Sequence, residues 1–225
     1  MIHTEIPTDA PRAIPEPTLR RLPLYYQYLK KVRDEKKIEF ISCTQIGNDL
    51  AILPIQVRKD LGVTDVIGKP KLGYSIDTLI ETIEDFLGWN NTKDAYLIGV
   101  GHLGTALLGF ERFKEYGLNI IAAFDNDVAK IGTTIHGVKI FPIGKLPNMV
   151  KRMGIKMGIL TVPAGPAQDL TNDMVKAGIK AIWNFSPVKV QVPVDIIIQH
   201  ENLASSLVVL SKKLAMARKN ERQDG

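Results

Sequence analysis

A glycine-rich hexapeptide, Gly99-Val100-Gly101-His102-Leu103-Gly104, restricts the fold of this 225-residue chain more than any other feature of the sequence. It follows the apolar run Ala95 to Ile98, which we predict to be a buried strand, and it opens a predicted helix from Leu103 to Tyr116. In such a turn the first glycine allows tight chain reversal, the second lets a pyrophosphate approach the backbone, and the third lets helix and strand pack closely. The N–H groups that begin the helix add a phosphate site. The hexapeptide therefore predicts a dinucleotide-binding domain, with its six residues as cofactor contacts.

The sequence around this motif alternates short apolar runs with amphipathic segments. This alternation is typical of a parallel sheet covered by helices on both faces. After the first strand, the apolar runs are 120–124, 138–141, 158–162, 181–185 and 194–199, with a further helix over 166–177. We therefore expect an α/β, Rossmann-like domain over residues 89–199, and a C-terminal segment, 200–225, that is helical from about Asn202 to Lys219.

Side chains at the ends of the later strands indicate which dinucleotide binds. Asp125 lies 21 residues after Gly104, where a carboxylate accepts hydrogen bonds from an adenosine ribose and repels a 2′-phosphate. This position favours NAD over NADP, although Lys130, a further candidate contact, is near enough in sequence to oppose the preference. The other candidates follow later strands at the same sheet edge: Thr161, Val162, Pro163, Ala164, Asn184 and Phe185. The alternatives are a Rossmann-like domain that binds another nucleotide, such as coenzyme A, or none.

No catalytic residue or metal site is predicted. A hydride-transfer enzyme usually needs a His, Lys or Tyr near the nicotinamide. His102 lies inside the phosphate loop, His136 in a predicted turn and His200 at the start of the C-terminal helix. The sequence therefore favours a sensor that is not an enzyme, and an NAD-dependent oxidoreductase is the alternative.

The N-terminal residues 1–88 show a different organisation. Residues 1–17 contain four prolines and are expected to form a flexible arm. A helix capped by Thr18 follows, and then helices over Ser42–Ala51 and Pro54–Leu61, a Gly-containing hairpin or wing over Gly62–Tyr74, and a helix from Ser75 or Asp77 to Leu87. This is the order of a winged helix-turn-helix. The alternative is a small helical cap on the second domain.

Charge and cysteine content limit the partners and the compartment. The net charge is +5, and residues 18–73 hold eleven Lys and Arg against six acids, which is compatible with a nucleic-acid face or with an ordinary solvated surface. Cys43 is the single cysteine, which excludes an internal disulfide. No signal peptide and no apolar run of roughly 20 residues is seen. We expect a cytoplasmic protein with no membrane partner.

Several of these segments together resemble the Rex family of redox-sensing repressors, over nearly the whole chain. The segments that carry the resemblance are Arg21–Tyr26, Gln56–Leu61, Gly99–Gly104, Ala122–Asp125, Leu160–Ala164, Ala177–Lys180, Asn184 and Phe185. The resemblance implies a homodimer with a domain-swapped C-terminal helix, which binds a palindromic operator near genes of fermentation and respiration. It also implies that NADH disfavours the DNA-binding arrangement, whereas NAD⁺ permits it.

The resemblance also assigns the DNA contacts. Arg58 and Lys59 would lie on the recognition helix, and Thr44 and Gln45 would hold backbone phosphates at the start of the preceding helix. The complete predicted set is Thr44, Gln45, Gln56, Arg58, Lys59, Lys69 and Lys71. The wing departs from the family, because Gly62-Val63-Thr64-Asp65 and Gly68-Lys69-Pro70-Lys71 replace an aromatic Ser-Tyr-Phe-Gly and a Gly-Lys-Arg-Gly tip. The arginine of the family's wing tip, which this chain lacks, is the side chain that suits a narrow minor groove.

A second departure concerns switching. Gln27, Phe110 and Asn202 stand where family members commonly have an arginine, a tyrosine and a partner-chain aspartate. A bonded, charged trio biases two domain arrangements more strongly than neutral side chains do. The hypothesis is that this chain couples NADH to DNA release weakly or through other contacts. A paralogue that binds nucleotide and dimerises but no longer reads an operator is a further alternative.

Overall fold

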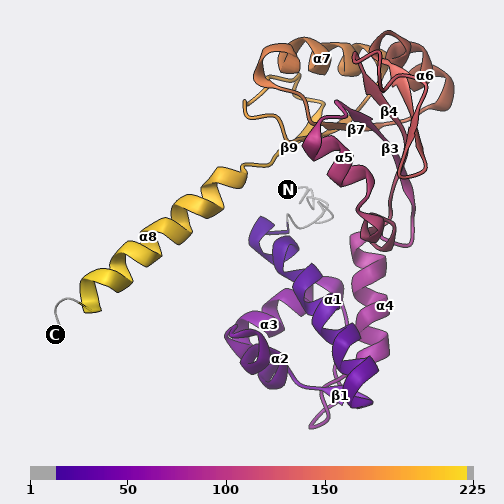
Figure 1. Ribbon diagram of the computed structural model, residues 1–225. Coiled ribbons are helices and arrows are strands. Elements are labelled where there is room, and N and C mark those ends of the chain that lie inside the picture. Colours follow the sequence, from indigo (N-terminus) through magenta and orange to yellow (C-terminus); the bar gives the residue numbers. More distant parts are fainter. Residues whose placement is uncertain (1–13, 222–225) are drawn as a thin grey trace, which may run out of the picture. The chain divides into compact units, whose positions relative to one another are not determined.

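The computed structural model describes residues 14–221 and divides into two compact units, with the boundary between Asn90 and Asn91 (Figure 1). Most of the predicted N-terminal arm (residues 1–13) and the last four residues, 222–225, lie outside the described part. No helix of the described part is long and apolar enough to cross a membrane. Within that part, no group of three or more His, Cys, Asp or Glu side chains is arranged to hold a metal ion.

Unit 1 has the helix order that the sequence predicts. Its elements are α1 (Glu16–Lys36), β1 (Phe40–Ile41), α2 (Cys43–Leu50), α3 (Pro54–Leu61), the 3-10 turn η1 (Gly62–Thr64), β2 (Tyr74–Ser75) and α4 (Ile76–Leu87). Buried apolar side chains from all four helices form one core. The turn between α2 and α3 needs a glycine at position 47, because a Cβ there would lie 2.5 Å from the Ile52 carbonyl oxygen.

One local prediction for unit 1 is wrong, and a second covers too long a segment. Thr18 does not cap α1, because the helix starts at Glu16 and places Pro17 in its first turn, where the missing N–H costs nothing. The hairpin or wing predicted over Gly62–Tyr74 is present but is much shorter than expected. The chain continues from α3 into η1, and the isolated bridge Lys69–Gly73 closes only a tight turn. Instead, β2 pairs antiparallel with β1, so the wing is reduced to the 69–73 turn.

Unit 2 contains a seven-stranded sheet in the order β5-β6-β4-β3-β7-β8-β9. The strands are β3 (Lys93–Ile98), β4 (Leu118–Asp125), β5 (Thr134–Ile135), β6 (Val138–Pro142), β7 (Met157–Leu160), β8 (Ala181–Asn184) and β9 (Ile197–His200). Within this sheet, only the pairing of β5 with β6 is antiparallel. Without β5, the order is that of a doubly wound dinucleotide-binding sheet, with β3 as its first strand. The predicted Rossmann-like architecture is confirmed.

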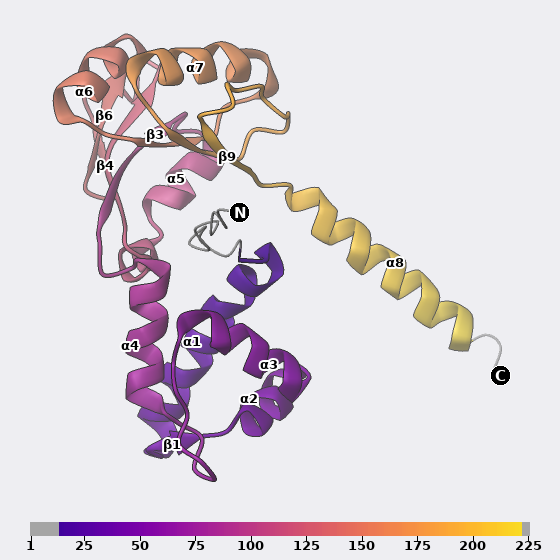
Figure 2. The same ribbon diagram turned by 180° about the vertical axis from the view of Figure 1, so that it is seen from behind.

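Helices cover both faces of this sheet (Figures 1 and 2). The elements that cover it are α5 (His102–Leu108), the 3-10 turns η2 (Glu111–Tyr116) and η3 (Ile143–Lys145), α6 (Leu146–Met153) and α7 (Ala164–Ala177), whereas the last helix, α8 (Leu203–Glu221), does not lie on the sheet. Ala95 and Leu97 of β3 face the α5 side, whereas Tyr96 and Ile98 pack in the cluster that includes α6 and α7. This alternation explains why β3 reads as a continuous apolar run.

The predicted helix Leu103–Tyr116 is wrong beyond Leu108. Gly109 ends α5, and Phe110 leaves the helical region with φ −83° and ψ 83°, so residues 111–116 form the separate turn η2. Several boundaries also shift. The strand predicted over 158–162 ends at Leu160, α7 begins at Ala164 instead of Pro166, and β9 begins at Ile197 instead of Val194. The early end of β7 leaves residues 161–163 as a turn at the carboxyl edge of the sheet.

Candidate functional site

The three glycines of the hexapeptide have different surroundings. A Cβ on Gly99, whose φ is +98°, would lie 2.7 Å from Val162 Cγ1, and a Cβ on Gly104 would lie 2.0 Å from the Gly99 carbonyl oxygen. These two glycines permit close packing of turn, helix and neighbouring strand. A Cβ on Gly101 would meet no protein atom within 4 Å. Gly101 therefore faces open space, as the dinucleotide fingerprint requires of the glycine that a pyrophosphate approaches.

That open space is a pocket of about 470 Å³ at the carboxyl ends of β3, β4 and β7. This is the place where doubly wound sheets bind nucleotides. Seven of the predicted cofactor residues line it: Gly99, Gly101, Asp125, Lys130, Thr161, Val162 and Pro163. The apolar walls come from Ile98, Phe124, Ile143 and Leu170. The structure thus brings half of the predicted set to one cavity and fits a dinucleotide in its chemistry.

Polar groups in this pocket hold the glycine turn in place. Asp125 Oδ2 accepts a hydrogen bond from the Val100 N–H at 2.6 Å, and its Oδ1 accepts one from the Asp127 N–H at 2.9 Å. The Thr161 hydroxyl lies 2.5 Å from the Gly99 carbonyl oxygen and donates to it. Asp125 therefore joins the glycine turn to the end of β4 by a hydrogen bond. In a dinucleotide-binding sheet, a carboxylate at the end of this strand recognises a ribose hydroxyl.

Lys130 is already paired. Its Nζ lies 3.3 Å from Asp127 Oδ2. The pKa of Asp127 is lowered, first by a hydrogen bond from the Ala129 backbone N–H and then by Lys130. The pair occupies the Lys130 ammonium with a carboxylate, which weakens the objection to NAD that the sequence raised.

The remaining predicted cofactor residues do not line this pocket. Val100 and Gly104 are buried within the turn, whereas His102 and Ala164 are exposed and Leu103 is half-buried. Asn184 is buried: its Oδ1 accepts from the Ser186 N–H at 2.9 Å, and its Nδ2 donates to the Val188 carbonyl at 2.9 Å. The Phe185 ring lies 4.7 Å from that of Trp183. The predicted cofactor contacts of these residues stay predictions.

A second site lies in unit 1, where a buried carboxylate fixes α3. Asp60 accepts hydrogen bonds from Arg21 Nε (2.6 Å), Arg21 Nη2 (2.8 Å), Tyr25 Oη (2.7 Å), Thr18 Oγ1 (2.9 Å) and Gln56 Nε2 (2.9 Å). Burial by itself raises the pKa of Asp60, but these hydrogen bonds outweigh it and hold the pKa at about 2. We call these five residues the Asp60 cluster. Sequence reasoning missed it, although the Gln56 and Asp60 spacing of one helical turn was visible.

The Asp60 cluster decides which side chains of α3 face outward. Gln56, a predicted DNA contact, directs its amide to Asp60, so its contact with DNA stays a prediction. Arg58 and Lys59 are exposed on α3. Thr44, Arg58, Lys69 and Lys71 line one cleft of about 400 Å³ between α2, α3 and the 69–73 turn. The structure thus brings together predicted contacts from three separate segments.

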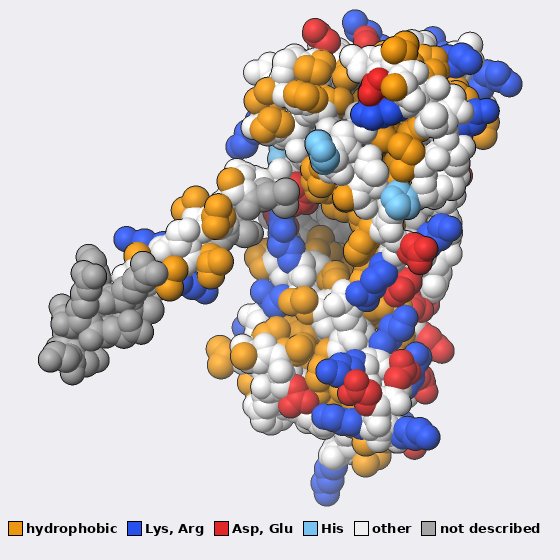
Figure 3. All heavy atoms as spheres, in the orientation of Figure 1, with side chains coloured by type: hydrophobic (Ala, Val, Ile, Leu, Met, Phe, Trp, Pro, Cys, Tyr) orange, Lys and Arg blue, Asp and Glu red, His pale blue; other side chains and the backbone are white. Residues whose placement is uncertain are grey.

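This cleft is suited to an anion. In the described part of the chain, no carboxylate lies within salt-bridge distance of Arg58, Lys59, Lys69 or Lys71. Lys69 Nζ lies 4.7 Å from the centre of the Phe40 ring. Gln45 is half-buried, and its backbone N–H donates to Ser42 Oγ, the cap of α2. In Figure 3, Lys and Arg side chains project from the end of unit 1 that carries β1.

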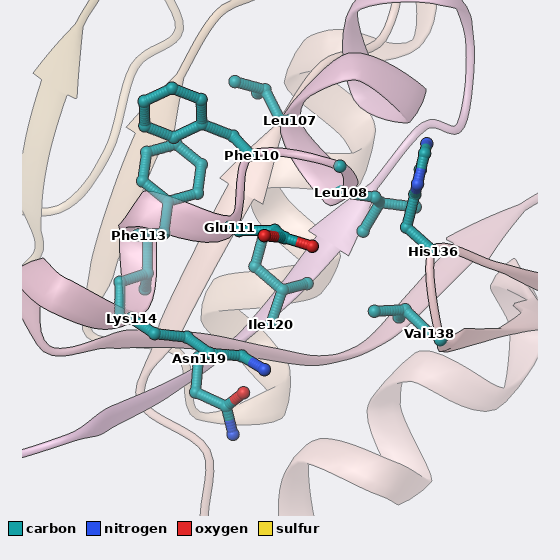
Figure 4. Close-up of a pocket in the computed structure, with 13 residues that line it drawn as sticks. Leu107, Leu108, Phe110, Glu111, Phe113, Lys114, Asn119, Ile120, His136 and Val138 are labelled. Carbon is teal, nitrogen blue, oxygen red and sulfur yellow. The ribbon is translucent and has the colours of Figure 1, made fainter.

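The three predicted switch positions lie on separate elements. Gln27 is exposed on α1 in unit 1. Phe110 precedes η2, stands edge-on to Phe113 with ring centres 4.8 Å apart, and lines a pocket of about 350 Å³ with Glu111 and His136 (Figure 4). Asn202 Oδ1 accepts a hydrogen bond from the Ala204 N–H at the start of α8. Their predicted role in coupling stays a prediction.

Comparisons with known proteins match both units of the chain. The family model described as "CoA binding domain" matches residues 90–188, and "Putative DNA-binding protein N-terminus" matches residues 13–62. The redox-sensing transcriptional repressor Rex of Treponema denticola is 50% identical over 86% of this chain and 92% of its own length. Rex of Bacteroides fragilis is 42% identical over 89% of this chain and 91% of its own length.

Solved structures give the same result. The Rex-family repressor RSP in complex with β-NAD⁺ and operator DNA has a TM-score of 0.85 and 30% identity, covering 95% of this chain and 98% of RSP. RSP in complex with β-NADH has a TM-score of 0.83 and 30% identity, covering 93% of this chain and 98% of RSP. A helix-turn-helix unit joined to a dinucleotide-type sheet defines the class as a nucleotide-responsive transcriptional regulator. The chain belongs to the Rex family of redox-sensing transcriptional repressors, as the sequence resemblance implied.

Proposed function

We propose that this chain is a homodimeric, cytoplasmic repressor that binds a palindromic operator through α3 and senses the NADH/NAD⁺ balance, with NADH favouring release. Its domains would be residues 1–88 for DNA, 89–199 for the dinucleotide and 200–225 for subunit exchange. The observation that carries the proposal is the open position beside Gly101 in the pocket of about 470 Å³, with the Asp125 carboxylate at its rim. The relative RSP is solved with β-NAD⁺ and operator DNA together, which supports the same pairing of ligands.

The composition of α8 supports the dimer. Leu207, Val208, Leu210 and Leu214 are all more than half exposed on this helix. Apolar side chains on consecutive positions point to several sides of a helix, so they need cover on more than one side. A second copy of the chain supplies that cover and agrees with the exchange that the family resemblance implies.

The direction of the response is that of the family, but its strength is a separate proposal. A ligand shifts an equilibrium only by its difference in affinity for the two states. Phe110 carries no hydroxyl, and Gln27 and Asn202 carry no charge. We therefore expect the NADH response to be weaker than a charged trio would give. The second candidate function, a paralogue with weakened DNA reading, rests on the reduced wing.

Operator selection from random DNA tests the proposal. The full chain is used without cofactor, with NAD⁺, with NADH and with coenzyme A, and each selected site is then titrated at several salt concentrations. We expect a two-fold symmetric site, binding that weakens with salt, and an effect of NADH that coenzyme A does not reproduce. Failure to enrich any site would contradict the repressor, and a coenzyme A effect without an NADH effect would contradict the assigned cofactor. Turnover of NADH with a substrate would contradict the view that the chain is not an enzyme.

A further inference from the structure

The outward face of α3 carries an apolar side chain beside its two cations. Ile55 is 57% exposed and lies three and four positions before Arg58 and Lys59, so all three share one face. The opposite face is closed, because Val57, Asp60 and Leu61 are fully buried. Ile55 is thus the apolar member of the only face of α3 that is open to a partner.

The position of Ile55 along the helix indicates what it meets. It is the second residue of α3, after Pro54. In helix-turn-helix proteins the N-terminal residues of the recognition helix contact base edges in the major groove. The only apolar group that a base presents there is the C5-methyl of thymine. The neighbouring cations, Arg58 and Lys59, make the same face attractive to the DNA backbone and to guanine.

The Asp60 cluster explains why Ile55, and not its neighbour, would carry this contact. A glutamine could read adenine with two hydrogen bonds, but the Gln56 amide donates to Asp60 at 2.9 Å. Asp60 also binds Arg21 and Tyr25 of α1, which fixes the rotation of α3 about its own axis. The helix therefore presents Ile55 outward and keeps Gln56 turned inward.

We propose that Ile55 is a specificity-determining residue that reads the C5-methyl group of one thymine in each operator half-site. This inference rests on the proposed DNA-binding function and deepens it. The contact buries the thymine methyl against the Ile55 side chain, and a base that lacks this methyl loses affinity. Arg58 and Lys59 supply the hydrogen bonds and positive charge of the same helix face, and the methyl contact acts in addition to them.

The test removes the methyl group and nothing else. The operator recovered by selection is synthesised with each thymine in turn, in both half-sites, replaced by 2′-deoxyuridine, and the dissociation constant of the full chain is measured. Burying one carbon changes a dissociation constant by a factor of about four. Replacement of the same thymine in both half-sites should therefore raise the dissociation constant by about sixteenfold at one thymine position. Ile55→Ala should bind the thymine operator more weakly and should lose nothing further on the deoxyuridine operator.

Two controls isolate the contact. Ile55→Val keeps a branched side chain and should retain most of the sensitivity to the methyl group, whereas Lys59→Ala should weaken binding to both operators by the same factor. The inference is overturned if no thymine replacement weakens wild-type binding, or if Ile55→Ala keeps the full loss at the sensitive position. Absence of any operator binding by the wild type would instead contradict the proposed function itself.

Discussion

Asp60→Asn removes one charge from the buried centre of unit 1 and keeps the shape of the side chain. The Asp60 carboxylate accepts five hydrogen bonds from four side chains, and the Arg21 side chain that faces it is only 25% exposed. An asparagine offers one acceptor oxygen, and its NH₂ group would face donors. We therefore expect this substitution to destabilise unit 1 while leaving unit 2 unchanged.

The size of the effect follows from the pKa of Asp60. Its fall from 3.8 to about 2 in the folded state corresponds to about 2.5 kcal/mol at neutral pH. A neutral hydrogen bond left unmade by Tyr25 or Thr18 adds about 1 kcal/mol. Water reaches part of Arg21, which keeps the loss at the lower end of the 3–5 kcal/mol typical of a fully buried broken pair. The expected decrease in the free energy of unfolding is about 3 kcal/mol.

Each unit contains one tryptophan, which makes the measurement selective. Trp89 stands edge-on to Tyr26 in unit 1, with ring centres 4.9 Å apart, whereas Trp183 lies on β8 in unit 2. In a Trp183→Phe background, urea unfolding followed by Trp89 fluorescence reports unit 1. Asp49→Asn is the matched control, because Asp49 is exposed and bonds Tyr28; it should cost less than about 1 kcal/mol.

A cycle with Arg21→Met completes the test. If the Arg21 and Asp60 side chains stabilise unit 1 together, the double variant should lose clearly less than the sum of the two single losses. The reasoning is refuted if Asp60→Asn costs no more than Asp49→Asn. Additive losses in the cycle would equally refute the assigned coupling.

Three further outcomes are expected. The folded-state pKa of Asp60 is depressed to about 2, so the Asp60 carboxylate stabilises unit 1 fully above its usual pKa of 3.8. This stabilisation is lost as the pH falls from 3.8 to about 2. Acid unfolding of wild-type unit 1, followed by Trp89 fluorescence, should therefore contain a step that Asp60→Asn lacks. Gly104→Ala places a Cβ 2.0 Å from the Gly99 carbonyl oxygen and should lower the stability of unit 2 by about 1–3 kcal/mol in urea unfolding followed by Trp183 fluorescence; unchanged stability would contradict the close packing. Lys69→Ala should reduce the slope of operator affinity against salt by about one phosphate contact per half-site, and an unchanged slope would place Lys69 away from the backbone.

The features that could be predicted from the sequence are those that depend on residues close together in the chain. Gly99–Gly104 follows a run of four apolar residues, so strand, turn and helix all leave local signals. The bounds of α3 were predicted correctly, from Pro54 at its start to Leu61 at its end. The prediction of a helix as far as Tyr116 was wrong, because Phe110 and Phe113 continue the apolar spacing beyond Gly109, although the backbone leaves the helix there.

The features that could not be predicted depend on contacts between distant segments. Thr18, Arg21 and Tyr25 reach Asp60 from 35 to 42 residues away, so no local pattern reveals the cluster. The pairing of β1 with β2 involves two residues on each side, too few to show an alternating pattern. Asn184 was placed correctly at the end of a strand, but its amide contacts His200 Nδ1 at 2.9 Å, a neighbour that only the parallel pairing of β8 with β9 supplies.

Titration of NADH into wild type and Gly101→Val tests the central claim most directly. The backbone at Gly101, with φ −76° and ψ −164°, accepts a side chain, and a Cβ there meets no protein atom within 4 Å. Valine should therefore leave unit 2 folded, with its urea transition unchanged, and should fill the space that the pyrophosphate occupies. The account predicts saturable binding by the wild type and an affinity at least about tenfold weaker for Gly101→Val. Wild type that binds neither NADH nor NAD⁺, or a folded Gly101→Val that binds NADH as well as wild type does, would contradict it.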